Sequence, residues 1–193
     1  MIDYITGKVT ELNPACVVVE CNGIGYNINI SLNTYAELDK ATDCKILIHE
    51  SIREDAHLLF GFTTADERDL FRQLITVSGV GAGTARMMLS SIRPADLRDA
   101  IISGDVGILK GVKGIGLKTA QRIIVDLKDK IGKHSVSGEI IAFSDNTARE
   151  ESLSALVMLG FARNSATKVI DNLLRENKKL PVEELVRRAL KLL

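Results

Sequence analysis

Two stretches of the sequence, 35 residues apart, carry the same pattern: residues 74–85 read LITVSGVGAGTA and residues 109–120 read LKGVKGIGLKTA. Both copies share a leucine, a valine, a Gly-apolar-Gly triplet, a threonine and an alanine at matching positions. The pattern predicts a helix, a tight turn and a second helix. Glycine permits the positive φ that a very short turn needs. The apolar residue of the triplet, Val80 or Ile115, is expected to anchor the turn to the helices.

Each turn is followed by a predicted helix whose first N–H groups lack acceptors within the helix and lie at the positive end of its dipole. This arrangement suits a phosphate. It reads no base edges, so we expect it to grip the sugar-phosphate backbone without sequence preference. The candidate DNA-binding residues of the first copy are Gly79, Val80, Gly81, Gly83, Thr84 and Arg86. Those of the second copy are Lys110, Lys113, Gly114, Ile115, Gly116, Lys118, Thr119 and Arg122.

Other interpretations of these glycines are open. A dinucleotide fingerprint needs a third glycine at another spacing and a preceding strand, and neither copy has them. A phosphate loop of the ATPase type is closer, because Gly111 and Gly116 have the required gap and Lys118-Thr119 follows. However, Leu117 is one residue too many and no strand precedes. The glycines could also serve only to pair helices tightly, although two copies in a basic segment disfavour that.

Upstream of the repeat, residues 1–63 contain β-branched runs and apolar–polar alternation, which are typical of strands. We predict strands over 2–12, 16–19, 24–30, 46–52 and 58–62, with a short helix over 31–40. Asn22-Gly23 is a strong two-residue hairpin signal. Five strands with a helix after the third are typical of an OB-type β-barrel.

Downstream, the periodicity becomes helical. Thr64 and Glu67 form a capping-box pattern that opens a helix through about residue 76, followed by helices near 84–91, 95–103, 105–110 and 118–131. Residues 134–146 are predicted to be a flexible linker. Residues 147–193 predict a three-helix module with helices over 147–159, 164–176 after a candidate cap at Asn164, and 181–192 with Pro181 at the first helical position. The predicted fold class is therefore α+β and multidomain.

The formal net charge of zero hides opposite signs along the chain. Residues 1–63 carry four basic and nine acidic side chains, a net charge of −5, whereas residues 64–133 carry twelve and eight, a net of +4. The basic excess coincides with the repeat.

The three cysteines form no Cys-x-x-Cys pair and the three histidines lack a plausible second ligand set, so we expect reduced thiols and no metal. The start, Met1-Ile2-Asp3-Tyr4, has no signal-peptide character, and we expect a soluble protein of the cytoplasm.

Together with Arg53–Phe62 (REDAHLLFGF) and Leu156–Phe161 (LVMLGF), the paired glycine turns make the chain resemble the RuvA family of Holliday-junction-binding subunits. The resemblance covers essentially the whole chain. The turns resemble helix-hairpin-helix motifs, and the last module is similar to ubiquitin-associated (UBA) domains.

The resemblance implies a homotetramer built by the barrel (1–63), a duplex grip by the tandem hairpins (64–133) and docking of the last module (147–193) on a hexameric AAA+ motor subunit, RuvB. It implies a junction-resolving endonuclease, RuvC, as a further partner. It also implies that ATP is used by the motor, so this chain needs no cofactor. Glu54 and Asp55 match the family's acidic pin at the junction centre. The candidate motor-docking residues are Leu156, Leu159, Phe161 and Leu190, for which an ordinary three-helix core is the alternative.

The family resemblance implies a non-enzymatic scaffold. A nuclease or glycosylase that uses the hairpins for grip is the alternative, and Asp126 and Asp129 on one helix face are its only close carboxylate pair. From the residues alone, Glu54 and Asp55 are interpreted as a polar turn between strands. Because they are adjacent, on a strand they would point apart rather than form a catalytic pair. A protein-binding adaptor that never contacts DNA stays open if the glycine repeat is purely structural.

Overall fold

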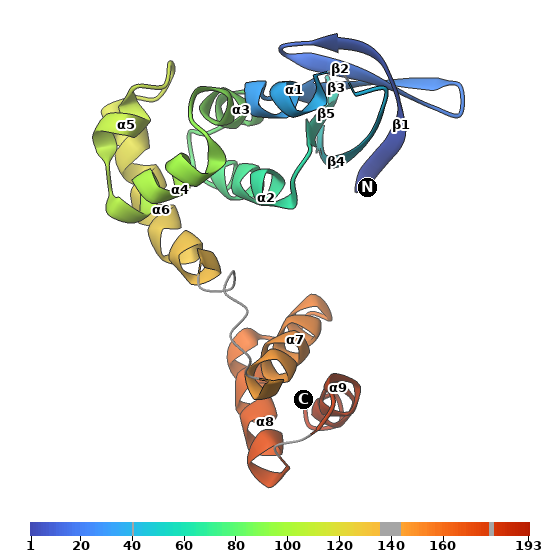
Figure 1. The fold of residues 1–193 in the computed structure, drawn as a ribbon. Helices are drawn as coiled ribbons and strands as arrows, with labels where there is room; N and C mark the ends of the chain where they lie inside the picture. Colours follow the sequence, from blue (N-terminus) through green and yellow to red (C-terminus); the bar gives the residue numbers. More distant parts are fainter. Residues whose placement is uncertain (40, 136–143, 178–179) are drawn as a thin grey trace. The chain divides into compact units, whose positions relative to one another are not determined.

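A computed structural model describes residues 1–39, 41–135, 144–177 and 180–193. The chain divides into two compact units, Met1–Gly138 and Glu139–Leu193. The strands are β1 (Tyr4–Asn13), β2 (Cys16–Cys21), β3 (Ile24–Ile30), β4 (Asp43–Ile52) and β5 (His57–Phe62) (Figure 1). The first unit also contains α1 (Leu32–Leu38), α2 (Ala65–Leu74), α3 (Ala82–Ser91), α4 (Pro94–Ser103), α5 (Val106–Lys110) and α6 (Leu117–Ser135). The second unit contains α7 (Ser144–Met158), α8 (Arg163–Glu176) and α9 (Val182–Ala189).

The five strands close into a barrel in the order β1-β2-β3-β5-β4, which confirms the predicted OB-type fold. All neighbours pair antiparallel except β3 and β5, which pair in parallel. Asn22 and Gly23 both have positive φ, as the predicted hairpin turn between β2 and β3 requires. Ile28 and Ile30 of β3 are buried while Asn27 and Asn29 lie on the outer face.

The last four residues of β5, from Leu59 to Phe62, are buried on both faces of the strand, because their alternating side chains belong to two different cores. Leu59 packs inside the barrel, and a Cβ on Gly61 would come within 2.6 Å of methyl groups of Ile28 and Ile46. Phe60 and Phe62 face the other way, with ring centroids 5.2 and 4.9 Å from that of Phe71 on α2. The barrel wall is therefore also one wall of the helical core.

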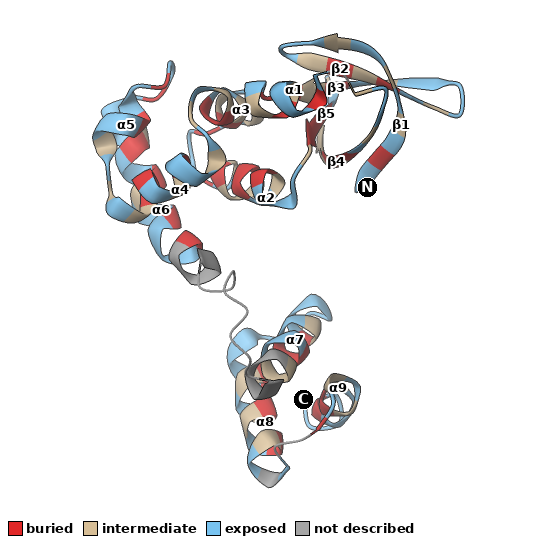
Figure 2. Cartoon of the chain, viewed as in Figure 1, coloured by how far each residue is buried: buried red, intermediate tan, exposed pale blue. Residues whose placement is uncertain are grey.

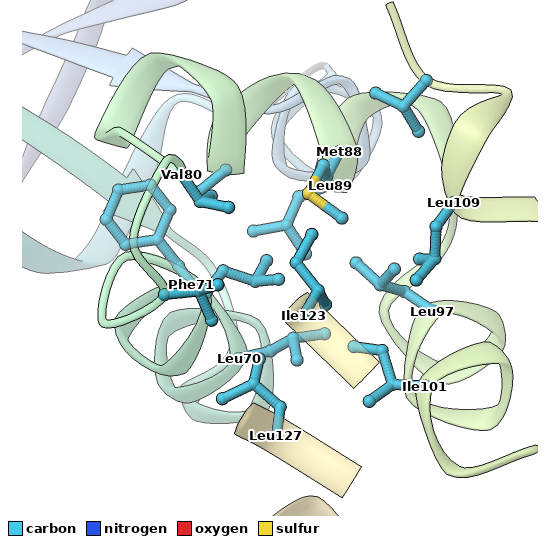
Figure 3. Packing of buried hydrophobic residues seen from close by; sticks show 14 of the residues in the cluster. Leu70, Phe71, Val80, Met88, Leu89, Leu97, Ile101, Leu109, Ile123 and Leu127 are labelled. Atoms are coloured by element: carbon cyan, nitrogen blue, oxygen red, sulfur yellow. The ribbon is translucent and has the colours of Figure 1, made fainter. Parts of the chain in front are cut away.

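The helical core collects the apolar faces of α2 to α6, and buried residues recur along all of these helices except the short α5, which contributes Leu109 (Figure 2). Leu70, Leu97, Ile101, Ile123 and Leu127 converge in its centre (Figure 3). Because the buried positions recur at helical spacing, each helix is held by its apolar face rather than by helix propensity alone.

The predicted capping box at the start of α2 is only half formed. Thr64 Oγ1 accepts a hydrogen bond from the Glu67 backbone N–H at 3.2 Å, as predicted. The Glu67 carboxylate does not return to the cap. It is buried and accepts hydrogen bonds from the hydroxyls of Ser31 and Thr34, at the start of α1. Burial raises the pKa of Glu67, against the lowering effect of these hydroxyl hydrogen bonds.

The second unit is a three-helix module with its own core, formed by residues such as Leu153, Leu156 and Ile170. Two sequence predictions on its helix ends are wrong. Asn164 lies inside α8, whose N-cap is Ala162 and has no side-chain hydrogen bond. Pro181 is the N-cap of α9 rather than its first helical residue, and α9 ends at Ala189.

The predicted linker over 134–146 lies mostly outside the described residues, between the last residue of α6, Ser135, and the first of α7, Ser144. Among the described residues, every helix is too short or too polar to cross a bilayer.

Candidate nucleic-acid interface

The two glycine turns have the same backbone geometry. Gly79 and Gly114 both have a φ of +93°, in the region where side chains are strained. In each copy the apolar residue donates a backbone hydrogen bond three residues back, Val80 to Val77 and Ile115 to Val112, both at 3.0 Å. The first backbone hydrogen bond of the next helix is also the same. The Ala85 N–H donates to the Gly81 carbonyl in the first copy and the Ala120 N–H to the Gly116 carbonyl in the second, both at 2.9 Å. The sequence repeat is thus a structural repeat.

Val80 and Ile115 are anchors, as predicted, and their side chains are only 4% and 5% exposed. Figure 3 shows Val80 among the core side chains, near Phe71. This corrects their place among the DNA-binding candidates, because only their backbone atoms can reach a ligand.

The sequence predicts positive φ at both glycines of each turn, but the second glycine of the first turn does not have it. Gly81 is the N-cap of α3 with φ −85°. A Cβ added to Gly81, Gly83 or Gly116 would meet no protein atom within 4 Å. Packing therefore does not demand glycine at these positions. Their lack of side chains leaves the helix starts open to close approach by a ligand.

The start of α3 also lacks a side-chain cap. In contrast, Ser31, Thr64 and Asp105 use their side chains to cap α1, α2 and α5. At α3 the first N–H groups stay available to an external acceptor, and an anion is the acceptor that the helix dipole favours.

The second turn is surrounded by exposed cations. Lys110, Lys113 and Lys118 are exposed, and within the described part of the chain they make no ion pair or hydrogen bond. Thr119 is half-buried. The exposed lysines can therefore approach phosphates without first breaking a contact inside the protein.

Arg122, on α6, reaches the other turn. Its Nη1 donates to the carbonyl oxygen of Ser78 at 3.2 Å, beside Gly79. The first turn, which carries Ala82 and Gly83 where a cation could stand, thus has an arginine of the second copy as its neighbour. The two residues are 44 positions apart, so the sequence alone gives no signal of this proximity.

Arg86 is the cation that the sequence predicts to bind DNA in the first hairpin, but its side chain contacts the barrel instead. Its Nη1 donates to the carbonyl oxygen of Ala15 at 3.0 Å and to Oδ1 of Asn29 at 2.9 Å. Arg86 is thus bound to the barrel and is half-buried. Thr84 is half-buried and Gly83 exposed, at the start of α3.

Glu54 and Asp55 lie in the turn between β4 and β5, and both are exposed. This confirms the interpretation of the pair as a polar turn between strands, because β4 stops at Ile52 and β5 begins at His57. The alternation that makes neighbours on a strand point apart does not apply to them. A hydrogen bond of 2.8 Å from the Arg53 N–H to the Ala56 carbonyl closes the turn. The two carboxylates therefore stand together at the tip of a hairpin.

The described residues do not gather the carboxylates that a metal-dependent nuclease would need. No three His, Cys, Asp or Glu side chains there lie close enough to hold a metal ion. Asp126 and Asp129 are exposed on α6 and bring no third carboxylate with them.

The predicted docking residues of the last module separate into two groups. Leu156 is fully buried in the module core, which corrects its assignment to a docking face, and Phe161 is half-buried against the same core. Leu159 is 60% exposed, and Leu190 is also exposed. The structure adds Met158, which is 88% exposed, and Leu192. Helical periodicity gives no signal for Met158 and Leu192, because Met158 is the last residue of α7 and Leu192 follows α9.

Three family models match the chain in order. The RuvA N terminal domain matches residues 1–61, a SAM-like helix-hairpin-helix tandem matches residues 71–129, and the RuvA C-terminal domain matches residues 147–193.

Full-length relatives are also similar to the chain. Proteins from Bacteroides fragilis and Christiangramia forsetii are 47% and 48% identical to it, over 99% of both chains in each case. One from Porphyromonas gingivalis is 47% identical over 100% of both. Each is named Holliday junction branch migration complex subunit RuvA.

Proposed function

The chain belongs to the RuvA family of Holliday junction branch migration complex subunits, and on that premise we propose that it binds four-way DNA junctions by their structure and recruits an ATP-driven motor to them. The observation that carries this function is the pair of turns with identical φ at Gly79 and Gly114. The space beside the glycines of both turns is open, and the second turn also has exposed lysines around it. The activity belongs to recombination and DNA repair.

The hairpins grip the arms through the phosphate backbone. N–H groups at the starts of α3 and α6 bind phosphate oxygens, and Lys110, Lys113 and Lys118 add charge. Since neither feature recognises base edges, binding is independent of sequence.

The acidic pin, Glu54 and Asp55, acts at the centre of the junction. A carboxylate 4 Å from a phosphate is repelled by about 1 kcal/mol in water, and more strongly where water is excluded. In a homotetramer, four copies of the pin would surround the crossover and keep it open. Strands could then separate and slide without being held by the protein at that point.

The last module recruits the motor. Met158, Leu159, Leu190 and Leu192 give it exposed apolar side chains that a partner can cover. The partner is a hexameric AAA+ ATPase, RuvB, which uses the ATP, so this chain acts without a cofactor and without catalysis of its own. RuvC, the resolving endonuclease, acts on the same open junction.

A gel shift tests junction binding. A synthetic four-way junction and a linear duplex of equal length are titrated with the full chain in the absence of nucleotide. We expect the junction to be bound at lower protein concentration. Equal binding of the two DNAs would contradict the proposed function.

A deletion of residues 147–193 tests the division of labour. The remaining chain keeps the barrel and the helical core, so we expect junction binding to persist. Stimulation of the motor should be lost, measured as branch migration of a labelled junction. Loss of junction binding in the truncated chain would contradict this assignment.

A further inference from the structure

Polar contacts hold helix α3 of the first hairpin against the barrel side of the molecule. The Leu32 N–H donates to Ser90 Oγ at 3.1 Å, and the Asn33 side chain donates to the Leu89 carbonyl. Arg86 lies one turn earlier on the same helix and bonds Ala15 and Asn29. In Figure 1, α3 accordingly lies next to α1.

Asn29 links Arg86 to strand β5, which follows the acidic pin in the sequence. Asn29 Oδ1 accepts from Arg86, and Asn29 Nδ2 donates to the Leu59 carbonyl at 3.2 Å. Leu59 lies in β5, which begins at His57, directly after the turn that holds Glu54 and Asp55. Arg86, Asn29 and Leu59 also line one recess of the surface.

The acceptors of Arg86 are a carbonyl and an amide oxygen, both neutral. A planar guanidinium that donates to two fixed acceptors is well suited to set an orientation. Its Nη1 donates to the barrel, whereas Lys110, Lys113 and Lys118 donate to no barrel residue within the described part of the chain.

We propose that Arg86 is a positioning residue, which fixes the first hairpin relative to the acidic pin through Asn29 and β5 rather than by binding DNA. This inference rests on the proposed function, because the quantity that Arg86 sets is the geometry between the arm grip and the junction centre. It assigns the two hairpins different tasks: the first sets the geometry and the second supplies the cationic grip.

The test measures the geometry of the bound junction separately from its affinity. Fluorophores on two neighbouring arms report their separation by energy transfer, at protein concentrations that saturate the junction. We expect Arg86→Ala to shift or broaden the energy-transfer distribution and to lower the preference for junction over duplex about tenfold. The slope of log K against log salt should stay as in the wild type, because no phosphate contact is lost.

Lys118→Ala is the matched control. It should make the salt slope shallower by about one while leaving the energy transfer of the saturated complex unchanged. Arg86→Lys keeps a cationic donor but lacks the planar guanidinium, so it should recover part of the wild-type distribution. A general loss of stability would change neither the energy-transfer distribution nor the salt slope, provided that the saturated complex is measured below the unfolding temperature.

A double-mutant cycle with Asn29→Ala ties the effect to the proposed contact. If Arg86 acts through Asn29, the double variant should be no more impaired than Arg86→Ala. Additive losses, a reduced salt slope for Arg86→Ala or an unchanged energy transfer would each overturn the proposal. A wild-type chain that fails to prefer the junction would instead contradict the proposed function.

Discussion

The two hairpins share one backbone and differ in their surroundings. Gly79 and Gly114 have the same φ, and the hydrogen bonds around them match in length. The second turn carries exposed lysines, whereas the first is followed by Ala82 and Gly83, and Arg86 contacts the barrel. The two copies thus share the backbone of the turn, while the side chains around them differ, which fits the separate tasks that we propose for the two hairpins.

The largest expected effect tests the shared backbone. Gly79→Val and Gly114→Val each force a β-branched residue to positive φ, at a cost of about 1–3 kcal/mol in the free energy of unfolding. Denaturant unfolding should give similar losses for the two variants. Gly81→Ala, at negative φ and with open space around its Cβ, is the control and should cost little. Clearly unequal losses at Gly79 and Gly114 would mean that the two turns are not equivalent.

The next effect tests the cationic grip of the second hairpin. Lys118→Ala should weaken junction binding more than Arg86→Ala does and make its salt dependence shallower by about one unit of slope, because one phosphate contact is lost. Gel shifts across a salt titration measure both quantities. Lys168→Ala removes the same charge from α8 in the second unit and should leave binding unchanged. Equal losses for Lys118→Ala and Arg86→Ala would remove the asymmetry between the hairpins.

A smaller effect should follow when the first hairpin is given the missing cation. A side chain at position 83 meets no protein atom, so Gly83→Lys should be accommodated. We expect a severalfold gain in junction affinity and a salt slope steeper by about one. Gly83→Ala separates the charge from helix propensity, which alone should stabilise the fold by up to about 1 kcal/mol. No gain in affinity from lysine beyond that from alanine would show that a cation at position 83 makes no phosphate contact.

The smallest effect concerns Glu67, where α2 meets α1. Its raised pKa means that the folded chain binds a proton more tightly than the unfolded chain. The stability that this proton contributes is fully present below the unfolded-state pKa and is lost as the pH rises through the folded-state pKa.

Glu67→Gln mimics the protonated side chain. Its melting temperature relative to wild type should therefore rise from acidic to neutral pH. Asp99→Asn, at an exposed carboxylate, controls for the loss of one charge. A difference that does not change with pH would contradict the assignment of a buried, proton-binding Glu67.

The sequence predicts most of the fold because its signals are local. Strand alternation, the Asn22-Gly23 turn and the glycine repeat each lie within a few residues, and the structure has all three. Residues that act across the fold could not be predicted in the same way. Arg86 contacts Asn29, 57 positions away, and Glu67 contacts Ser31, 36 positions away.

In the last module, helical spacing also could not predict which leucine side chains are exposed. Helical spacing predicts that Leu156 and Leu159 lie on an apolar surface, but it does not tell a core from a docking face. Only the packing of α7 against α8 and α9 buries Leu156 and leaves Leu159 exposed. Glu54 and Asp55 differ from Leu156, because the strands predicted over 46–52 and 58–62 already leave them in a turn, where the structure has them.

The two faces of β5 have a consequence for how such a protein can be assembled from parts in evolution. Because Phe60 and Phe62 complete the helical core while Leu59 and Gly61 complete the barrel, neither half can be exchanged for an unrelated one without exposing half of a core. The module of α7, α8 and α9 completes its own core. It can be replaced or grafted as a whole, so a change of motor requires less redesign of the chain than a change of the DNA that it holds.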